Sequence, residues 1–246
     1  MALFDASERS KSAGRRPWGL RSRWLSREDG HRRPTTPVAT GADGAADTGI
    51  YLFGMVRGAA HRGAPLRDFG GEFLWIRHRG LVALAQRAPF DLPPLERPDV
   101  LAHQRVVERV MRRGTILPAP PGVVFSGQRP LLRFLADQYL ALEEGLAFVD
   151  GHWEIRLHVA PSTSDADPDE LSHLATHIYA ELRRHARAAV PFPREDERLL
   201  SAAFLVDRGA WVEFVERAED LGAAHRGLAL DVTGPWPPYD FVRIVF

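Results

Sequence analysis

The sequence predicts an α+β fold built from two small α/β domains that follow a disordered N-terminal segment. From residue 50 onwards the order of strand-like and helix-like stretches is β-ββ-α-β-α in the first half and β-α-β-α-β in the second. Strands are indicated by short apolar or alternating runs, and helices by apolar residues at helical spacing. Such patterns favour small sheets covered by helices on one face, the plan of ferredoxin-like domains. We therefore expect a segment 1–49, a domain 50–149 and a domain 150–246.

The N-terminal segment differs in composition from the rest of the chain. It is rich in Arg, Ser, Gly, Ala and Asp, shows no apolar periodicity, and carries nine basic and six acidic residues. A segment of this kind buries too little apolar surface to offset the entropy lost on ordering. We therefore predict that residues 1–49 are disordered.

The elements of the first half follow from local patterns. Gly80, between two strand-like runs, is a hairpin signal. Asp99 is expected to cap a helix that ends at Gly114 and carries His103 on its apolar side. A second helix is expected to bury four leucines that share one side, Leu131, Leu135, Leu142 and Leu146. The expected strands are 50–56, 72–78, 81–85 and 123–125, and the expected helices are 99–113 and 128–148.

The second half begins after the turn at Asp150-Gly151. An acidic turn before residue 170 is expected to open a helix that runs to about residue 189, and Asp207 is expected to cap the next one. The expected strands are 153–159, 199–206 and 227–233.

The last strand is followed by an unusual proline-aromatic segment. Gly234 permits a sharp turn, and three prolines within four residues fix φ and remove backbone donors. We expect this segment to leave the sheet as a stiff, extended piece. It would pack on its own domain or bind another protein. The predicted protein-binding residues are Trp236, Pro237, Pro238, Tyr239 and Phe241.

The composition excludes several classes of function. With 45% hydrophobic and 26% charged residues the chain has the makeup of a globular protein with a core. A formal net charge of zero gives no reason to expect nucleic acid or a lipid membrane as a partner. The absence of cysteine excludes disulfides, thiol catalysis and cysteine-ligated metals, and no apolar run is long enough for a membrane span or a secretory signal.

Two groups of histidines are candidates for chemistry. His173 and His177, with Glu170 and Glu181, have the spacing of a zinc site, but they lie opposite the apolar stripe of their helix, as a solvated face would. His103 fits a hydrogen-bonded core histidine. No catalytic constellation, phosphate loop or cofactor motif is present, so we expect no catalytic residue, no cofactor and no metal.

Four stretches together carry a resemblance to a known family. They are Tyr51-Leu52-Phe53-Gly54-Met55-Val56; His103-Gln104-Arg105-Val106-Val107-Glu108 with Leu117-Pro118 and Gly122-Val123-Val124-Phe125; Ser201-Ala202-Ala203-Phe204-Leu205-Val206; and Thr233-Gly234-Pro235-Trp236-Pro237-Pro238-Tyr239-Asp240-Phe241-Val242. In content and order they resemble the gas vesicle protein F/L family over residues 50–242. The chain departs from the family at residues 117–123, where an arginine and an aromatic residue are missing.

The resemblance implies a non-enzymatic protein with two α/β domains, the C-terminal one ferredoxin-like. It implies work in gas vesicle assembly, a location at the gas vesicle in the cytoplasm, and partners among gas vesicle shell protein A and other accessory proteins. Whether such a protein stays in the wall or acts as a transient chaperone is left open. The alternative is an enzyme or ligand-binding protein on a ferredoxin-like scaffold, with a polar pocket lined by His103, His78 or His152.

Overall fold

The computed structural model describes residues 48–58, 66, 72–162, 167–193, 198–225, 227–242 and 244. The predicted disorder of residues 1–49 lies outside the described residues, except for Thr48 and Gly49, which begin the first strand. No helix among the described residues combines the length and the apolar character that crossing a membrane requires.

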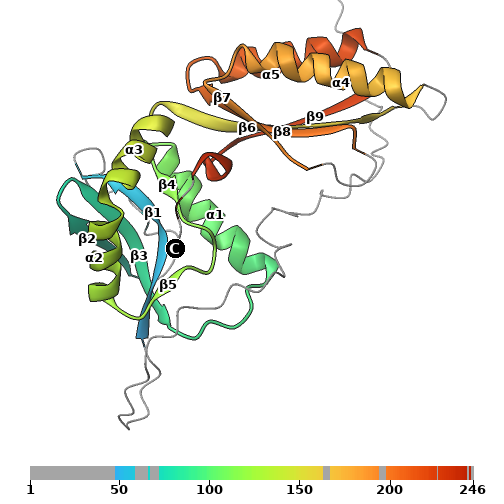
Figure 1. Ribbon diagram of the computed structural model, residues 1–246. Helices are drawn as coiled ribbons and strands as arrows, with labels where there is room; N and C mark the ends of the chain where they lie inside the picture. The colour runs from blue at the N-terminus through green and yellow to red at the C-terminus, as the bar shows by residue number, and fades with distance from the viewer. Residues whose placement is uncertain are drawn as a thin grey trace, which may run out of the picture. The chain divides into compact units, whose positions relative to one another are not determined.

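The first sheet is antiparallel and has five strands (Figure 1). β2 (Phe73–His78) pairs with β3 (Leu81–Pro89), and β3 pairs with β1 (Thr48–Arg57). Two short strands, β4 (Leu117–Pro118) and β5 (Val124–Phe125), both pair with the other edge of β1. The predicted hairpin at Gly80 is present between β2 and β3.

Helices cover both faces of this sheet, so the prediction of a single covered face is wrong here. α2 (Gln128–Asp137) and α3 (Tyr139–Val149) pack on one face, and α1 (Arg97–Met111) packs on the other. The reason lies in β1, because its side chains enter two cores: Leu52 and Met55 pack with α2 and α3, whereas Phe53 and Val56 pack with α1.

Two helix boundaries differ from those predicted. α1 is capped by Glu96 rather than Asp99, which sits at the third helical position and completes a capping box. The single helix expected over 128–148 is divided at Gln138, which ends α2 and precedes α3. The four leucines predicted on its inner side are all fully buried, as expected.

The second sheet has the order β7-β8-β6-β9, and every neighbouring pair is antiparallel. Its elements are β6 (His152–Pro161), α4 (Pro168–Arg183), β7 (Ala188–Pro191), β8 (Leu200–Asp207), α5 (Trp211–Ala224) and β9 (Leu228–Trp236). Both helices lie on one face of the sheet (Figure 1). This is the ferredoxin-like βαββαβ arrangement expected from the sequence. The predicted boundary near residue 150 falls in the turn between α3 and β6 and stays a prediction.

The second sheet corrects three expectations. α4 ends at Arg183, and residues 188–191 form the edge strand β7 rather than helix. α5 is capped at Ala210 instead of Asp207, whose carboxylate accepts a bond from Gly209 N. β9 does not stop at residue 233, because a register shift carries it on to pair Trp236 with Glu154. Pro235 is tolerated there because β9 is an edge strand and Pro235 lies within the register shift between Thr233 and Trp236.

Candidate protein-binding surface

The C-terminal segment predicted to bind proteins folds back onto the described chain. After β9, Pro237 and Pro238 are buried, and a 3₁₀ turn (Tyr239–Phe241) follows. Tyr239 packs against the α1-side core of the first sheet, and Phe241 packs against the core beneath α2 and α3. Leu205 of β8 belongs to that same core. The segment therefore joins side chains from both sheets.

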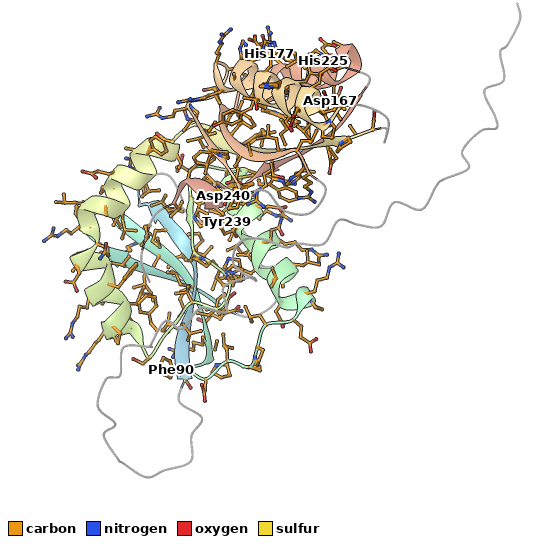
Figure 2. All side chains as sticks on the ribbon, turned by 45° about the vertical axis from the view of Figure 1, so that its right-hand side comes forward. Phe90, Asp167, His177, His225, Tyr239 and Asp240 are labelled. Carbon is orange, nitrogen blue, oxygen red and sulfur yellow. The ribbon has the colours of Figure 1, made fainter. Side chains whose placement is uncertain are left out.

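A buried charge network fixes the turn to β6. Arg156 Nε donates to Glu154 Oε1 at 2.6 Å, and Arg156 Nη2 donates to Asp240 Oδ2 at 2.8 Å. The backbone N–H of Asp240 donates to Glu154 Oε2 at 2.9 Å. Figure 2 shows Tyr239 and Asp240 next to each other on this turn. Sequence reasoning missed the network because Asp240 lies 86 residues from Glu154; its only local signal is two charged residues on one face of a strand.

Burial dominates the electrostatics of this turn. Glu154 is completely buried, and burial raises its pKa to about 8, although the Arg156 guanidinium opposes part of the rise. Burial also raises the pKa of Tyr239 far above its usual value. The Tyr239 hydroxyl has no hydrogen-bond partner among the described residues.

Among the predicted binding residues, Trp236 has surroundings that differ from those of the others. Its indole is half-buried at the end of β9, and Nε1 donates to Thr233 Oγ1 at 3.1 Å. Tyr239 and Phe241 instead pack against the protein's own cores, which is one of the two roles expected for the segment, and Pro237 and Pro238 beside them are buried. A partner contact of these five residues stays a prediction.

The candidate histidines do not form one site. His103 is buried as predicted: Nε2 donates to Ala119 O at 3.0 Å, and Nδ1 accepts from the Tyr51 hydroxyl at 2.8 Å. This tautomer satisfies both partners, and burial lowers the pKa of His103 to about 4. His78 contacts the Tyr139 ring, and His152 contacts Asp150 O.

The metal candidate on α4 stays solvent-facing. His173 and His177 are exposed, and Figure 2 shows His177 on the side of α4 away from the sheet. In the described ranges no three His, Asp or Glu side chains stand close enough to hold a metal ion. A hollow of about 430 Å³ beside β2 contains two charged lining residues, Arg77 and Arg87, and none of the candidate histidines.

Four large apolar side chains are exposed in the described part of the chain: Phe90, Leu140, Phe148 and Val212. Two of them lie on α3, where Leu140 is 74% and Phe148 38% exposed. The Arg187 guanidinium lies over the Phe148 ring, 5.3 Å from its centroid. Sequence analysis overlooked this surface because it assigned the helix only an inner side.

Comparison with known proteins identifies the family. The model of the gas vesicle synthesis protein GvpL/GvpF family matches residues 49–171 and 166–243. The chain belongs to this family. The family recognised from the sequence motifs is thereby confirmed, and with it a role connected with gas vesicles.

Individual relatives agree with this assignment. Gas vesicle protein L of Streptomyces sp. is 27% identical over 79% of this chain and 92% of its own length. Gas vesicle protein F1 of Halobacterium salinarum is 29% identical over 59% of this chain and 70% of its own. The fold is similar to the crystal structure of GvpF from Anabaena sp. PCC7120, with a TM-score of 0.66 at 18% identity over 81% of this chain and 98% of that one. GvpF from Microcystis aeruginosa gives a TM-score of 0.67 at 18% identity, covering 80% of this chain and 99% of that one.

Proposed function

We propose that this protein takes part in gas vesicle assembly as a non-catalytic component that binds the small shell protein and other gas vesicle proteins. The observation that carries the proposal is the family match, which extends through both sheets and into the C-terminal segment. The relatives in Streptomyces and Halobacterium are themselves gas vesicle proteins.

The arrangement of polar groups supports binding over catalysis. Inside the protein, Arg156 donates hydrogen bonds to Glu154 and Asp240. Both ring nitrogens of His103 are hydrogen-bonded, one to Tyr51 and the other to Ala119. A ligand-binding or enzymatic role would instead need polar groups that converge on a cavity, and the hollow beside β2 brings Arg77 and Arg87 together without an acidic or histidine side chain in its lining. Partner binding, in contrast, requires exposed apolar surface, which this chain has on α3.

Within this proposal the C-terminal segment has two duties. Pro237, Pro238, Tyr239 and Phe241 hold the segment in place, and Trp236 contributes to the partner contact from its half-buried position at the sheet edge. A rigid, proline-braced tryptophan loses little entropy when it is covered by a partner.

Co-purification with the small gas vesicle shell protein tests the proposal. We expect Trp236→Ala to reduce the recovered shell protein several-fold, and Trp236→Phe to retain more of it because an aromatic ring remains. Phe90→Ala, which removes an exposed aromatic elsewhere, is the matched control. Thermal melting of each variant separates lost binding from lost folding. Unchanged melting together with unchanged shell protein recovery in Trp236→Ala would remove Trp236 from the binding surface.

Deletion of the gene tests the wider role. Cells without this protein should form few or no gas vesicles, and the full chain should restore them. Normal buoyancy in the deleted strain contradicts the proposed function. Washing isolated vesicles with urea then distinguishes a wall component, which resists removal, from a transient assembly factor.

A further inference from the structure

The outer face of α3 is apolar although it faces solvent. The inner face of this helix buries Leu142, Leu146 and Val149, as a covering helix should. The outer face carries Leu140 and Phe148, both exposed, together with the exposed small residues Ala141 and Ala147. A helix that is apolar on both sides is typically enclosed by protein on both sides.

Three outer residues of α3 follow one another at intervals of four. Leu140, Glu144 and Phe148 therefore lie along one face, and the first and last are about 12 Å apart along the helix axis. We call Leu140, Glu144, Ala147 and Phe148 the α3 stripe. The Arg187 guanidinium lies over the Phe148 ring, a cation–π contact that favours this position of the ring.

Glu144 decides what kind of partner the α3 stripe fits. It is exposed and stands midway between the two large apolar side chains. In a two-fold dimer built by antiparallel packing of α3 on its own copy, Leu140 would meet Phe148 of the other copy, and Glu144 would meet Glu144 at the crossing. Packed helices approach to 8–10 Å between axes, so these carboxylates would repel each other while losing water. The charge therefore disfavours a second copy and favours a partner with a cation at that position.

We propose that the α3 stripe docks an amphipathic helix of another gas vesicle protein, in which an arginine or lysine lies between two large apolar residues spaced three or four positions on either side. The apolar residues cover Leu140 and Phe148, and the basic residue pairs with Glu144. Recognition then uses the helix-in-groove mode, with the charge pair setting register. This inference rests on the proposed function, because it names the chemistry of the partner that the function requires.

Site-specific photo-crosslinking in gas-vesicle-forming cells tests the partner directly. A benzophenone amino acid at position 140 of the full chain should crosslink to a gas vesicle protein, and digestion should map the link to a helical segment with the basic-between-apolar pattern. The same amino acid at position 212 is the matched control, because Val212 is also an exposed apolar residue on a helix, α5. Crosslinks at position 140 that reach only another copy of this chain, only a segment without that pattern, or no protein at all overturn the proposal.

Variants test the energetic part of the proposal with the partner that crosslinking identifies. Leu140→Asp should weaken binding about tenfold or more, because it places a charge where the partner's large apolar residue would cover Leu140. Glu144→Arg should weaken binding as well, and a Glu in place of the partner's basic residue should restore it. Val212→Asp should leave binding within about twofold. Melting temperatures should stay unchanged, since these side chains are exposed in the free protein.

The two proposals can fail separately. If the deleted strain lacks gas vesicles but Leu140→Asp and Glu144→Arg chains support normal vesicles and bind the partner normally, the proposed function stands and the α3 stripe has no docking role. If the charge exchange fails to restore binding that Glu144→Arg has lost, the partner contact does not use the pairing inferred here.

Discussion

At the scale of single residues, the least expected feature is a carboxyl group sealed inside the protein. Glu154 is 0% exposed, and its two oxygens accept bonds from Arg156 and from the backbone of Asp240. One guanidinium thus serves two carboxyl groups, Glu154 and Asp240. Two carboxylates and one cation leave an excess negative charge in a buried place, which is costly. Protonation of Glu154 removes that excess.

Stability should therefore depend on the ionisation of Glu154. Burial raises its pKa from 4.5 to about 8, so the folded state favours the protonated form. An acid of this kind contributes most to stability below its unfolded pKa, and that contribution is lost as pH rises through about 8. We expect the free energy of unfolding of the natural chain to fall, relative to that of Glu154→Gln, between pH 5 and pH 8.

Urea denaturation at a series of pH values measures this difference. Comparison with Glu154→Gln cancels the titration of groups common to both chains, including His103, whose lowered pKa acts in the opposite direction. Glu213→Gln, on the exposed surface of α5, should follow the natural chain at every pH. If the curves of the natural chain and Glu154→Gln run parallel, Glu154 is not protonated over this range.

At the scale of elements, one hydrogen-bond chain ties α1 to β1 and to the connector between β4 and β5. The Tyr51 hydroxyl donates to His103 Nδ1 at 2.8 Å and accepts from Gly122 N at 3.2 Å. His103 continues the chain to Ala119 O. The connector contains two prolines, Pro120 and Pro121, and follows a third at the end of β4, so it offers few backbone donors of its own. The side chains of Tyr51 and His103 hold the connector through their hydrogen bonds to Gly122 N and Ala119 O.

Removing the Tyr51 hydroxyl should loosen this connector. Tyr51→Phe keeps the ring contacts with Phe53 and His103 but leaves His103 Nδ1 and Gly122 N without their partner. We expect a loss of about 1–3 kcal/mol in the free energy of unfolding, the usual cost of an unsatisfied buried polar group. Chemical denaturation measures the loss, and Tyr179→Phe on α4 is the control. A Tyr51→Phe chain as stable as the natural one would show that the hydrogen bonds contribute nothing net.

The comparison of sequence and structure is most informative at this scale. Helical spacing was enough to place Leu131, Leu135, Leu142 and Leu146 in the core and to make His103 a core histidine. It was not enough for β7, because Ala188 and Ala189 continue an alanine-rich helical pattern and only pairing with β8 makes them a strand. The extension of β9 through Pro235 likewise depends on edge position, a property of sheet order and not of local sequence.

For the candidate site, the sequence identified the residues of the C-terminal segment but not the residues that they contact. The proline-aromatic residues marked the C-terminal segment as special, but the cores against which Tyr239 and Phe241 pack are built from residues far away in sequence, such as Phe53 and Leu131. The exposed apolar face of α3 could not be predicted from the sequence for a different reason. A helix with apolar residues on both sides gives a weak periodic signal, so the sequence showed its buried leucines and not which apolar residues remain exposed.

At the scale of the described chain from residue 48 onwards, the C-terminal turn packs against both cores of the first sheet and is bonded to the second sheet. Tyr239 packs against the core that contains Phe53 and Val107, Phe241 packs against the core that contains Leu52 and Leu205, and Asp240 bonds to Arg156 of β6. Arg208, after β8, adds a bond to Arg112 O at the end of α1. Three consecutive residues thus connect side chains from both sheets. Substitution of one of them should therefore destabilise both sheets.

Phe241→Ala tests this connection. The substitution removes a ring from the core beneath α2 and α3, and because Phe241 is only partly buried we expect a loss of about 1–3 kcal/mol, below the full cost of a core Phe→Ala change. Native-state hydrogen exchange should quicken for amides of both β1 and β6, since the turn that carries Phe241 also holds Asp240 against Arg156. Phe90→Ala should leave both strands as protected as in the natural chain, because Phe90 is 45% exposed and lies outside the cores. Faster exchange in β1 with unchanged protection in β6 would mean that the C-terminal turn packs on the first sheet without coupling it to the second.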